Sequence, residues 1–365
     1  MAGKPSHTIS RQTRRAFLAA TGTGATMAVA GCLGDDDDDT EGDQLDAVRD
    51  VDTFRMKTSE RGTTGHAALE AMASTLNDHL EGLSLEAQTS SGTEENIGDI
   101  NSGDIEMGFL QNWTAREFRE DVPPFDEIDF QMTQVFHYYD LPWFFITARD
   151  DLETLSDIGD GMTVSPTPSG SGTAPGLEAA LEYPTGGDFE RISVSFAEQG
   201  GAMAEGRLDV GVGTMMNFAI TPGWLQEAVA STDEFTVLGV EESTRQEWED
   251  DDRLLSQMLD MNQMEGADAD DVHVPGEIAA PTFSYNFVSR GELDYDAVYH
   301  FLETMWEQRG ALADAFGIFG FHDNPEFWVE NPYEGIPFHP AAADFYDEEL
   351  EVWRDEFERA DVPDA

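Results

Sequence analysis

Residues 90–111 read SSGTEENIGDINSGDIEMGFLQ, and this stretch contains the pattern that decides the fold. Serine and threonine before a pair of glutamates are typical of a helix start, so we expect a helix from Glu94 to about Gly103. The apolar segment 105–110 then predicts a strand that ends at Gln111. A polar loop, a helix and a strand in this order indicate an α/β protein.

The same unit recurs on both sides of this stretch. A strand at 54–58, a helix at 67–76 and a strand at 83–87 come before it, and together they predict a parallel sheet. The aromatic run 135–147 predicts a strand that passes into a second lobe, and 283–288 predicts one that returns to the first. The remaining expected strands are 162–164, 192–196 and 208–212, and the remaining expected helices are 175–181, 200–205, 295–309 and 341–358.

Length and charge restrict the function. A chain of 365 residues suits two lobes. Its 19 Lys+Arg against 75 Asp+Glu give a net charge of −56, which argues against nucleic-acid binding because phosphate recognition depends on basic side chains. The single cysteine excludes a disulfide scaffold and a cysteine-rich metal site. Carboxylates spread so evenly are typical of a protein that works in molar salt, where charge repulsion is screened.

The N-terminal segment predicts export. Arg14 and Arg15 precede an apolar run at 16–30 that is shorter than the roughly 20 residues a bilayer requires, which resembles a twin-arginine signal. The run ends at Cys32, which we expect to be lipidated after removal of residues 1–31. The acidic residues 32–50 then predict an extended tether. The expected location is the outer face of the cytoplasmic membrane, reached through a lipid anchor.

Three loops with the same composition lie between expected strands and expected helices. A helix start offers free N–H groups and a partial positive charge, while Ser and Thr add hydroxyl donors, so such loops can hold an anion without lysine. Thr214, after a second-lobe strand, is a further candidate. Ordinary helix capping remains the alternative explanation for each loop taken singly. The candidates in the three loops are Thr63, Thr64, Gly65; Ser91, Gly92, Thr93; and Ser169, Ser171, Gly172, Thr173.

Three segments, 54–69, 90–111 and 162–181, resemble the TAXI family, the substrate-binding receptors of tripartite ATP-independent periplasmic (TRAP) transporters. The resemblance implies a type II periplasmic-binding-protein fold, in which two α/β lobes joined by crossover strands close on a small ligand. It also implies a carboxylate ligand such as glutamate or 2-oxoglutarate, delivery to a membrane permease, and ligand contacts from Asn96 and Gln111. The expected first lobe is 51–145 plus 280–365, and the expected second lobe is 146–279. At 59–61, Ser-Glu-Arg departs from the family's Gly/Thr-rich loop, which leaves the ligand's identity open.

Two other functions remain open at this stage. A sensory or chemotaxis receptor would use the same binding fold, and an exported hydrolase would use Ser171 as a nucleophile, although Ser171 lacks the G-x-S-x-G frame. The eight histidines are scattered and form no H-E-x-x-H motif, so we expect no metal, no cofactor and no catalytic residue. Asn112 begins an N-x-[ST] sequon, which is an acceptor sequence for N-glycosylation in exported proteins.

Overall fold

The computed structural model describes residues 52–168 and 171–361. The predicted signal, the predicted lipidation site Cys32 and the predicted acidic tether lie outside these described residues. Three parallel strands form one side of the main sheet, in the order β2-β1-β3. The elements of this part of the first lobe are β1 (Thr53–Lys57), α1 (Thr64–Leu76), β2 (Ser84–Gln88), α2 (Thr93–Ser102), β3 (Met107–Gln111) and α3 (Asn112–Arg119).

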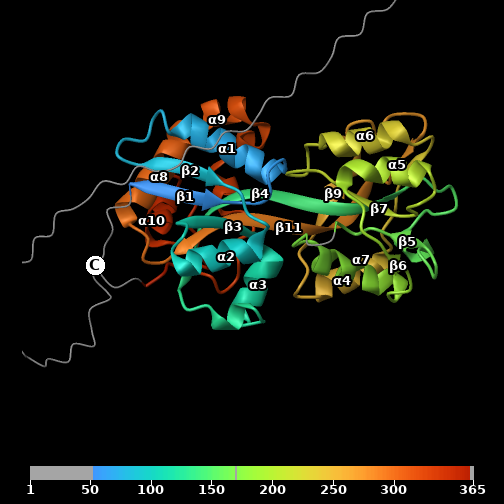
Figure 1. The fold of residues 1–365 in the computed structure, drawn as a ribbon, viewed down its shortest axis with the longest axis horizontal. Coiled ribbons are helices and arrows are strands. Elements are labelled where there is room, and N and C mark those ends of the chain that lie inside the picture. Colours follow the sequence, from blue (N-terminus) through green and yellow to red (C-terminus); the bar gives the residue numbers. More distant parts are fainter. Residues whose placement is uncertain (1–51, 169–170, 362–365) are drawn as a thin grey trace, which may run out of the picture. The chain divides into compact units, whose positions relative to one another are not determined.

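Two long strands connect the lobes. The strands β4 (Met132–Thr147) and β11 (Glu277–Arg290) pair in an antiparallel way, and Figure 1 shows them running from one lobe into the other. In the first lobe β11 also pairs with β3, whereas in the second lobe β4 pairs with β7 and β8, and β11 pairs with β9. The predicted α/β class, with the type II arrangement of two lobes joined by crossover strands, is therefore confirmed.

The second lobe is built from short strands and helices between the two crossover strands. Figure 1 shows α5 and α6 on one side of its strands and α4 and α7 on the other. These elements are β5 (Thr163–Val164), α4 (Ala174–Thr185), β6 (Glu190–Arg191), α5 (Gln199–Ala204), β7 (Gly211–Thr214), α6 (Gly223–Ser231), β8 (Phe235–Val237), α7 (Glu242–Asp250), β9 (Ser256–Asp260) and β10 (Val272–His273).

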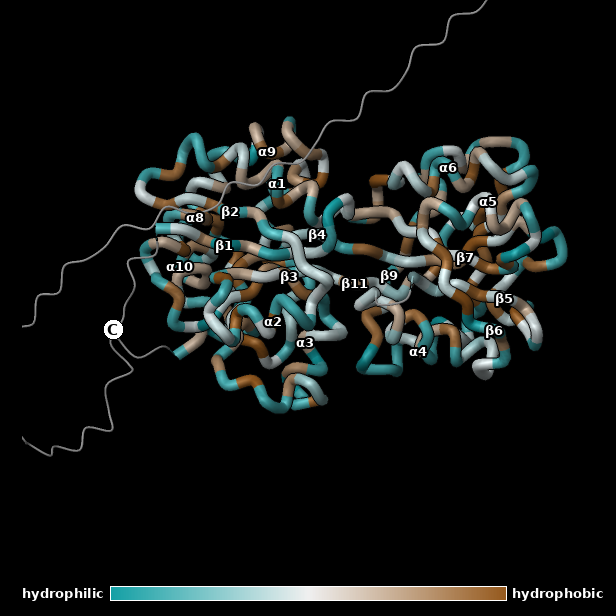
Figure 2. The backbone as a smooth tube through the Cα atoms, in the orientation of Figure 1, coloured by the Kyte–Doolittle hydropathy of each residue, from teal (hydrophilic) through white to brown (hydrophobic). Residues whose placement is uncertain are grey.

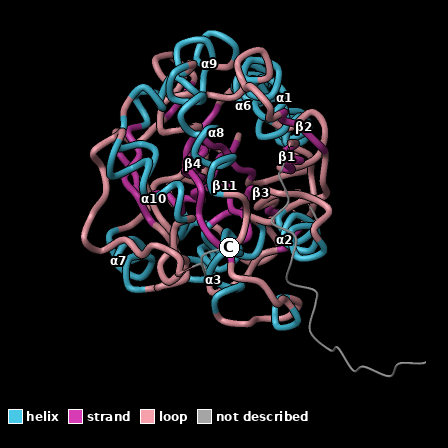
Figure 3. The backbone as a smooth tube through the Cα atoms, turned by 90° about the vertical axis from the view of Figure 1, so that its left-hand side faces the viewer, coloured by secondary structure: helices cyan, strands magenta, loops and turns pink. Residues whose placement is uncertain are grey.

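The C-terminal elements return to the first lobe and complete it. They are α8 (Tyr295–Glu307), α9 (Arg309–Ala315), the 3-10 segments η5 (Gly317–Asp323) and η6 (Pro325–Val329), and α10 (Pro340–Glu348). Figure 3 shows strands at the centre of the molecule with helices placed around them. Within 52–168 and 171–361, no helix has both the length and the apolar character needed to cross a membrane.

One hydrophobic core extends from the first lobe along the crossover strands into the second, where it includes Leu177 and Trp248. Phe136 on β4 and Phe287 on β11 stack with ring centroids 4.9 Å apart, and Phe301 of α8 packs on Phe136. In the second lobe, Phe144 of β4 belongs to a separate buried cluster with Phe235 of β8. Figure 2 shows hydrophilic residues along many of the outward loops, as expected for a chain of this charge.

Two expected elements are wrong. No strand forms at 192–196, because the Val194 amide donates to the Ser165 hydroxyl and Phe196 stacks against Trp224 instead of continuing a ladder. The helix expected at 341–358 ends at Glu348, and Glu351 has a φ of +55°. Beyond that point the chain folds back, and Phe357 packs on Phe338 with ring centroids 5.3 Å apart.

Candidate ligand-binding site

The turn before α1 uses its threonine for capping. The Thr63 hydroxyl accepts from the His66 amide at 3.3 Å and donates to the Glu60 carbonyl at 2.8 Å, while Thr64 is the first helical residue. Gly65 lies against the crossover strand, where an added Cβ would stand 2.8 Å from the Tyr139 hydroxyl oxygen. Glycine is therefore required at 65 for the helix start to approach Tyr139 this closely.

The loop before α2 is fixed by an ion pair. Ser91 donates to Glu95 through its hydroxyl at 2.6 Å and its amide at 2.9 Å. Lys57 at the end of β1 reaches Glu95 at 2.9 Å and Asp99 at 2.5 Å. The Ser91 hydroxyl is thus committed to the protein, whereas Gly92 and Thr93 follow it toward the second lobe. Thr93 is buried, and its hydroxyl lies 3.3 Å from that of Thr114.

Glu95 should make this loop sensitive to acid. The ammonium of Lys57 and the donors of Ser91 lower the pKa of Glu95 to about 2, below its ordinary value of 4.5. A lowered folded-state pKa stabilises the fold above the ordinary value and ceases to do so as the pH falls toward 2. We expect Glu95→Gln to flatten the fall of the melting temperature between about pH 4.5 and pH 2. Glu94→Gln, at the exposed neighbouring position, serves as the control, and equal curves for both variants would contradict the role of Glu95.

Asn96 and Gln111 have different roles. Asn96 donates to the carbonyls of Thr58 at 2.8 Å and Phe109 at 2.9 Å, so it braces the ends of β1 and β3. Gln111 caps α3 by accepting from the Thr114 amide at 3.0 Å. Its amide nitrogen donates to the Gly172 carbonyl of the second lobe at 2.9 Å. Gln111 therefore links the two lobes directly.

The loop before α4 meets this glutamine. A Cβ added at Gly172 would stand 3.3 Å from the Thr93 hydroxyl and 3.7 Å from the Gln111 amide nitrogen. The hydroxyls of Ser171 and Thr173 lie 2.8 Å apart, and Thr173 is buried at the start of α4. Ser169 lies outside the described residues. The starts of α2 and α4 thus come together from opposite lobes.

Several candidates do not contact this group, because the side chains of Thr63, Ser91 and Asn96 bond within the first lobe and that of Thr214 bonds to the crossover strand β4. Thr214 is buried on β7, where it pairs with Trp143 of β4, and its hydroxyl donates to the Pro142 carbonyl at 2.7 Å. The Thr214 hydroxyl therefore uses its donor on the crossover strand β4 and not toward the other candidates. The structure brings Thr93, Gln111 and Gly172 together. Gly65 lies beside an aromatic wall whose ring centroids are 4.8–6.3 Å apart. The wall consists of Phe109, Tyr139 and Tyr285.

Three further side chains have unused donors, and two of them, Thr58 and Thr167, were not selected from the sequence. The hydroxyls of Thr58 and Thr167 and the indole N–H of Trp143 are buried and make no hydrogen bond within the described chain. Thr58 directly follows β1 and Thr167 follows β5, so their positions after strands were a usable signal. Trp143 stacks with Phe196 at 5.5 Å. Buried donors without partners are costly unless a bound molecule accepts from them.

The site offers hydroxyl and amide donors beside an aromatic wall. Such groups suit a small ligand that carries oxygen acceptors, and the helix starts favour negative charge on it. Among the described residues, no group of three or more His, Cys, Asp or Glu is placed to hold a metal ion. The arrangement gathers hydrogen-bond donors beside aromatic rings where the two lobes meet.

Three solved structures illustrate what the chain is similar to. A ligand-binding component of an ABC-type import system from Staphylococcus aureus, with zinc bound, is 14% identical over 74% of this chain and 79% of that chain, with a TM-score of 0.40. The periplasmic aliphatic sulphonate binding protein from Escherichia coli is 12% identical over 81% and 78%, with a TM-score of 0.43. A nutrient binding protein from Burkholderia cenocepacia bound to methionine is 11% identical over 72% and 97%, with a TM-score of 0.40.

A comparison with curated protein sequences gave no match. A family model, in contrast, matches residues 56–349, a span that includes both crossover strands and the helix starts described above. Because this match covers most of the chain, the protein belongs to the NMT1-like family.

Proposed function

We propose that this protein is an extracytoplasmic solute-binding receptor, which closes on a small carboxylate between its lobes and delivers it to a membrane permease. The observation that carries this proposal is the meeting of Thr93, Gln111 and Gly172, which joins the starts of α2 and α4. Both helices are long enough to present an N-terminal partial positive charge, and a ligand carboxylate between them would receive it from both sides.

The division of the chain follows from the same proposal. Residues 51–145 plus 280–365 form the first lobe and 146–279 the second, so closure brings the second lobe onto Gln111. Residues 1–31 serve as a twin-arginine signal, Cys32 carries the lipid, and 32–50 hold the folded part away from the membrane. Folding before export fits a ligand site assembled from segments as distant as 93 and 172.

Binding, not catalysis, is the proposed activity. The Ser171 hydroxyl lies 2.8 Å from that of Thr173, which is no base for a nucleophilic serine at neutral pH. Membership of the NMT1-like family supports the same conclusion.

The finer proposal is a permease of the TRAP type, because the loops resemble those of TAXI receptors. The similar structure from Staphylococcus aureus is a ligand-binding component of an ABC-type import system, and an ABC permease is the competing partner. The neighbouring genes distinguish the two: a large multi-span subunit without an ATP-binding subunit supports the TRAP type, and an ATP-binding subunit contradicts it.

Ligand binding is expected to raise the melting temperature in molar salt. Glutamate or 2-oxoglutarate at 100 times its Kd should stabilise the protein by about 2.7 kcal/mol. Thr93→Val and Ser171→Ala should each weaken that binding by about 1–3 kcal/mol, because each removes a hydroxyl donor at a helix start. Isothermal titration measures the affinities.

Ser102→Ala is the matched control for these variants. Ser102 is exposed at the opposite end of α2, and its hydroxyl bonds Asp104, so this variant should bind as the unaltered protein does. A panel of small carboxylates that leaves the melting temperature unchanged would contradict the proposed ligand class. Unaltered affinity in both Thr93→Val and Ser171→Ala would move the site elsewhere.

A further inference from the structure

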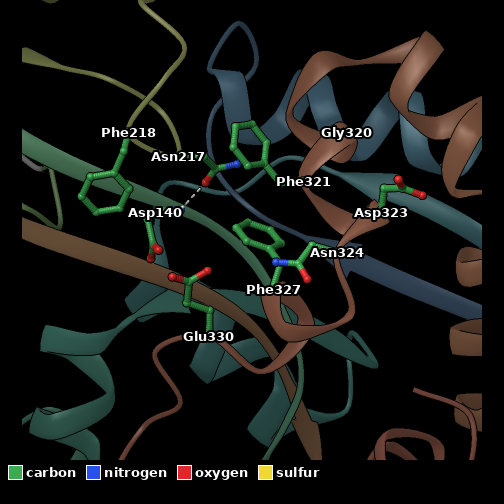
Figure 4. Close-up of a pocket in the computed structure, with 9 residues that line it drawn as sticks. All are labelled: Asp140, Asn217, Phe218, Gly320, Phe321, Asp323, Asn324, Phe327 and Glu330. Carbon is green, nitrogen blue, oxygen red and sulfur yellow. Dashed lines mark hydrogen bonds between the residues drawn. The ribbon is translucent and has the colours of Figure 1, made fainter. Parts of the chain in front are cut away.

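A hollow of about 510 Å³ lies beside β4, on the side that faces η6 (Figure 4). The turn after β7 forms one wall, and η5 and η6 with the residue that follows them form the other. Both lobes therefore contribute to it. Its lining residues are Asp140, Asn217, Phe218, Gly320, Phe321, Asp323, Asn324, Phe327 and Glu330.

Asp140 gives the hollow a buried carboxylate with a free oxygen. The residue is 1% exposed, and its Oδ2 accepts from the Asn331 side chain at 2.9 Å and lies 3.6 Å from His137 Nε2. Its Oδ1 makes no hydrogen bond within the described chain. An ionised oxygen buried without a donor is costly, so the geometry favours a bound N–H donor at this position.

Asn217 places a second unused group beside it. Its Oδ1 accepts from the Asp140 amide at 2.8 Å, which fixes the side chain, as the dashed line in Figure 4 shows. Its Nδ2 is buried and makes no hydrogen bond within the described chain. Two residues that line the hollow therefore hold one fixed, unused acceptor, Asp140 Oδ1, and one fixed, unused donor, Asn217 Nδ2, both buried.

The remaining walls are aromatic and acidic. Phe218, Phe321 and Phe327 supply ring surface, and Figure 4 shows the carboxyl group of Glu330 directed toward that of Asp140. Asp323 is already paired with Arg309 at 3.0 Å. Among the described residues that line the hollow, none is Lys or Arg. Aromatic faces and carboxylates with no Lys or Arg partner in the lining together favour an organic cation.

We infer that this hollow is a second binding site, for a protonated organic amine that also carries an oxygen acceptor. The ammonium N–H donates to Asp140 Oδ1, the oxygen accepts from Asn217 Nδ2, and the carbon chain packs against the phenylalanines. A bare metal ion fits poorly, because no described group of three or more His, Cys, Asp or Glu could hold one. The site goes beyond the proposed carboxylate receptor, since its charge selects the opposite kind of ligand.

The probe is 4-aminobutan-1-ol at pH 7 and constant molar NaCl, with 1,4-butanediol as its uncharged counterpart. We expect the amino alcohol to raise the melting temperature and the diol to have no effect. Asp140→Asn should weaken binding of the amino alcohol by about 10-fold or more, because a charge-assisted hydrogen bond is lost. Glu326→Gln, on an exposed residue of η6 outside the lining, should leave it unchanged.

Equal responses to the amino alcohol and the diol would overturn the inference, as would unchanged affinity in Asp140→Asn. Where Asp140→Asn does not fold, Phe218→Ala, on a half-buried wall residue, carries the test and should also weaken binding. Carboxylates are titrated separately on the same variants. Loss of the amine response with an intact carboxylate response counts against this site alone, and the reverse counts against the proposed receptor function alone.

Discussion

Replacing Gln134 with alanine is expected to lower the free energy of unfolding by about 3–5 kcal/mol, because it leaves several buried polar groups without partners. Gln134 is 1% exposed on β4. Its side-chain oxygen accepts from the Tyr333 amide at 2.6 Å, and its nitrogen donates to the Ile336 carbonyl at 2.5 Å. Both backbone groups would remain buried after the substitution.

The effect should extend to the crossover, since Tyr333 donates to the Leu110 carbonyl and accepts from the Asn286 amide at 2.8 Å. Denaturant unfolding in molar salt measures the loss. Gln246→Ala is the matched control, because Gln246 is exposed on α7 and its side-chain amide donates to the surface residue Glu242. That control should change stability by less than about 0.5 kcal/mol. Equal changes in the free energy of unfolding for the two variants would show that the buried hydrogen bonds of Gln134 do not stabilise the fold.

Gly176→Ala is expected to separate the lobes at the start of α4. An added Cβ would stand 2.7 Å from the Phe283 ring of β11 and 3.1 Å from the Trp113 ring of α3. Overpacking of this kind costs about 1–3 kcal/mol, and the helix must move away from the first lobe to relieve it. We expect a lower melting temperature and weaker carboxylate binding, since the move separates Gly172 from Gln111.

Gly201→Ala provides the comparison. Gly201 is exposed in α5, and a Cβ there would meet nothing within 4 Å. Alanine is favoured over glycine inside a helix by about 1 kcal/mol, so this variant should be as stable as the original or more so. Both variants carry the same gain in helix propensity, and the difference between them isolates the contact of α4 with the first lobe. A Gly176→Ala protein that binds carboxylates normally would contradict the proposed closure.

Local signals explain what could be predicted from the sequence. The strand that ends at Gln111 and the helix that begins at Thr93 follow from apolar periodicity and caps, which act within a few residues. Thr93 and Gly172 are 79 positions apart, yet each lies in a polar loop between an expected strand and an expected helix. Such loops gather at the carboxyl ends of the strands, which is why the two residues were expected near one ligand. The strand expected at 192–196 failed because the Ser165 hydroxyl takes an amide that a ladder would need.

Other features depended on contacts that no local pattern contains. Thr214 is the type of residue expected in the site, but its hydroxyl donates to the Pro142 carbonyl. This hydrogen bond depends on the pairing of β7 with β4. The hollow beside Asp140 requires Glu330, which lies 190 positions further along the chain. In a sequence with 75 acidic residues, neither carboxylate could be distinguished from the solvated surface.

Two register shifts interrupt the pairing of β4 with β11, and one of them affects which side chains lie on each side of the crossover. The β4–β11 register shifts between Tyr285 and Asn286, which pair with Tyr139 and His137, so Tyr138 is an extra residue in β4. The tyrosines at 138 and 139 consequently both reach Gly65, while His137 and Asp140 lie together on the side of η6. A single additional amino acid thus gives the two lobes' connection a phenolic side and an acidic side.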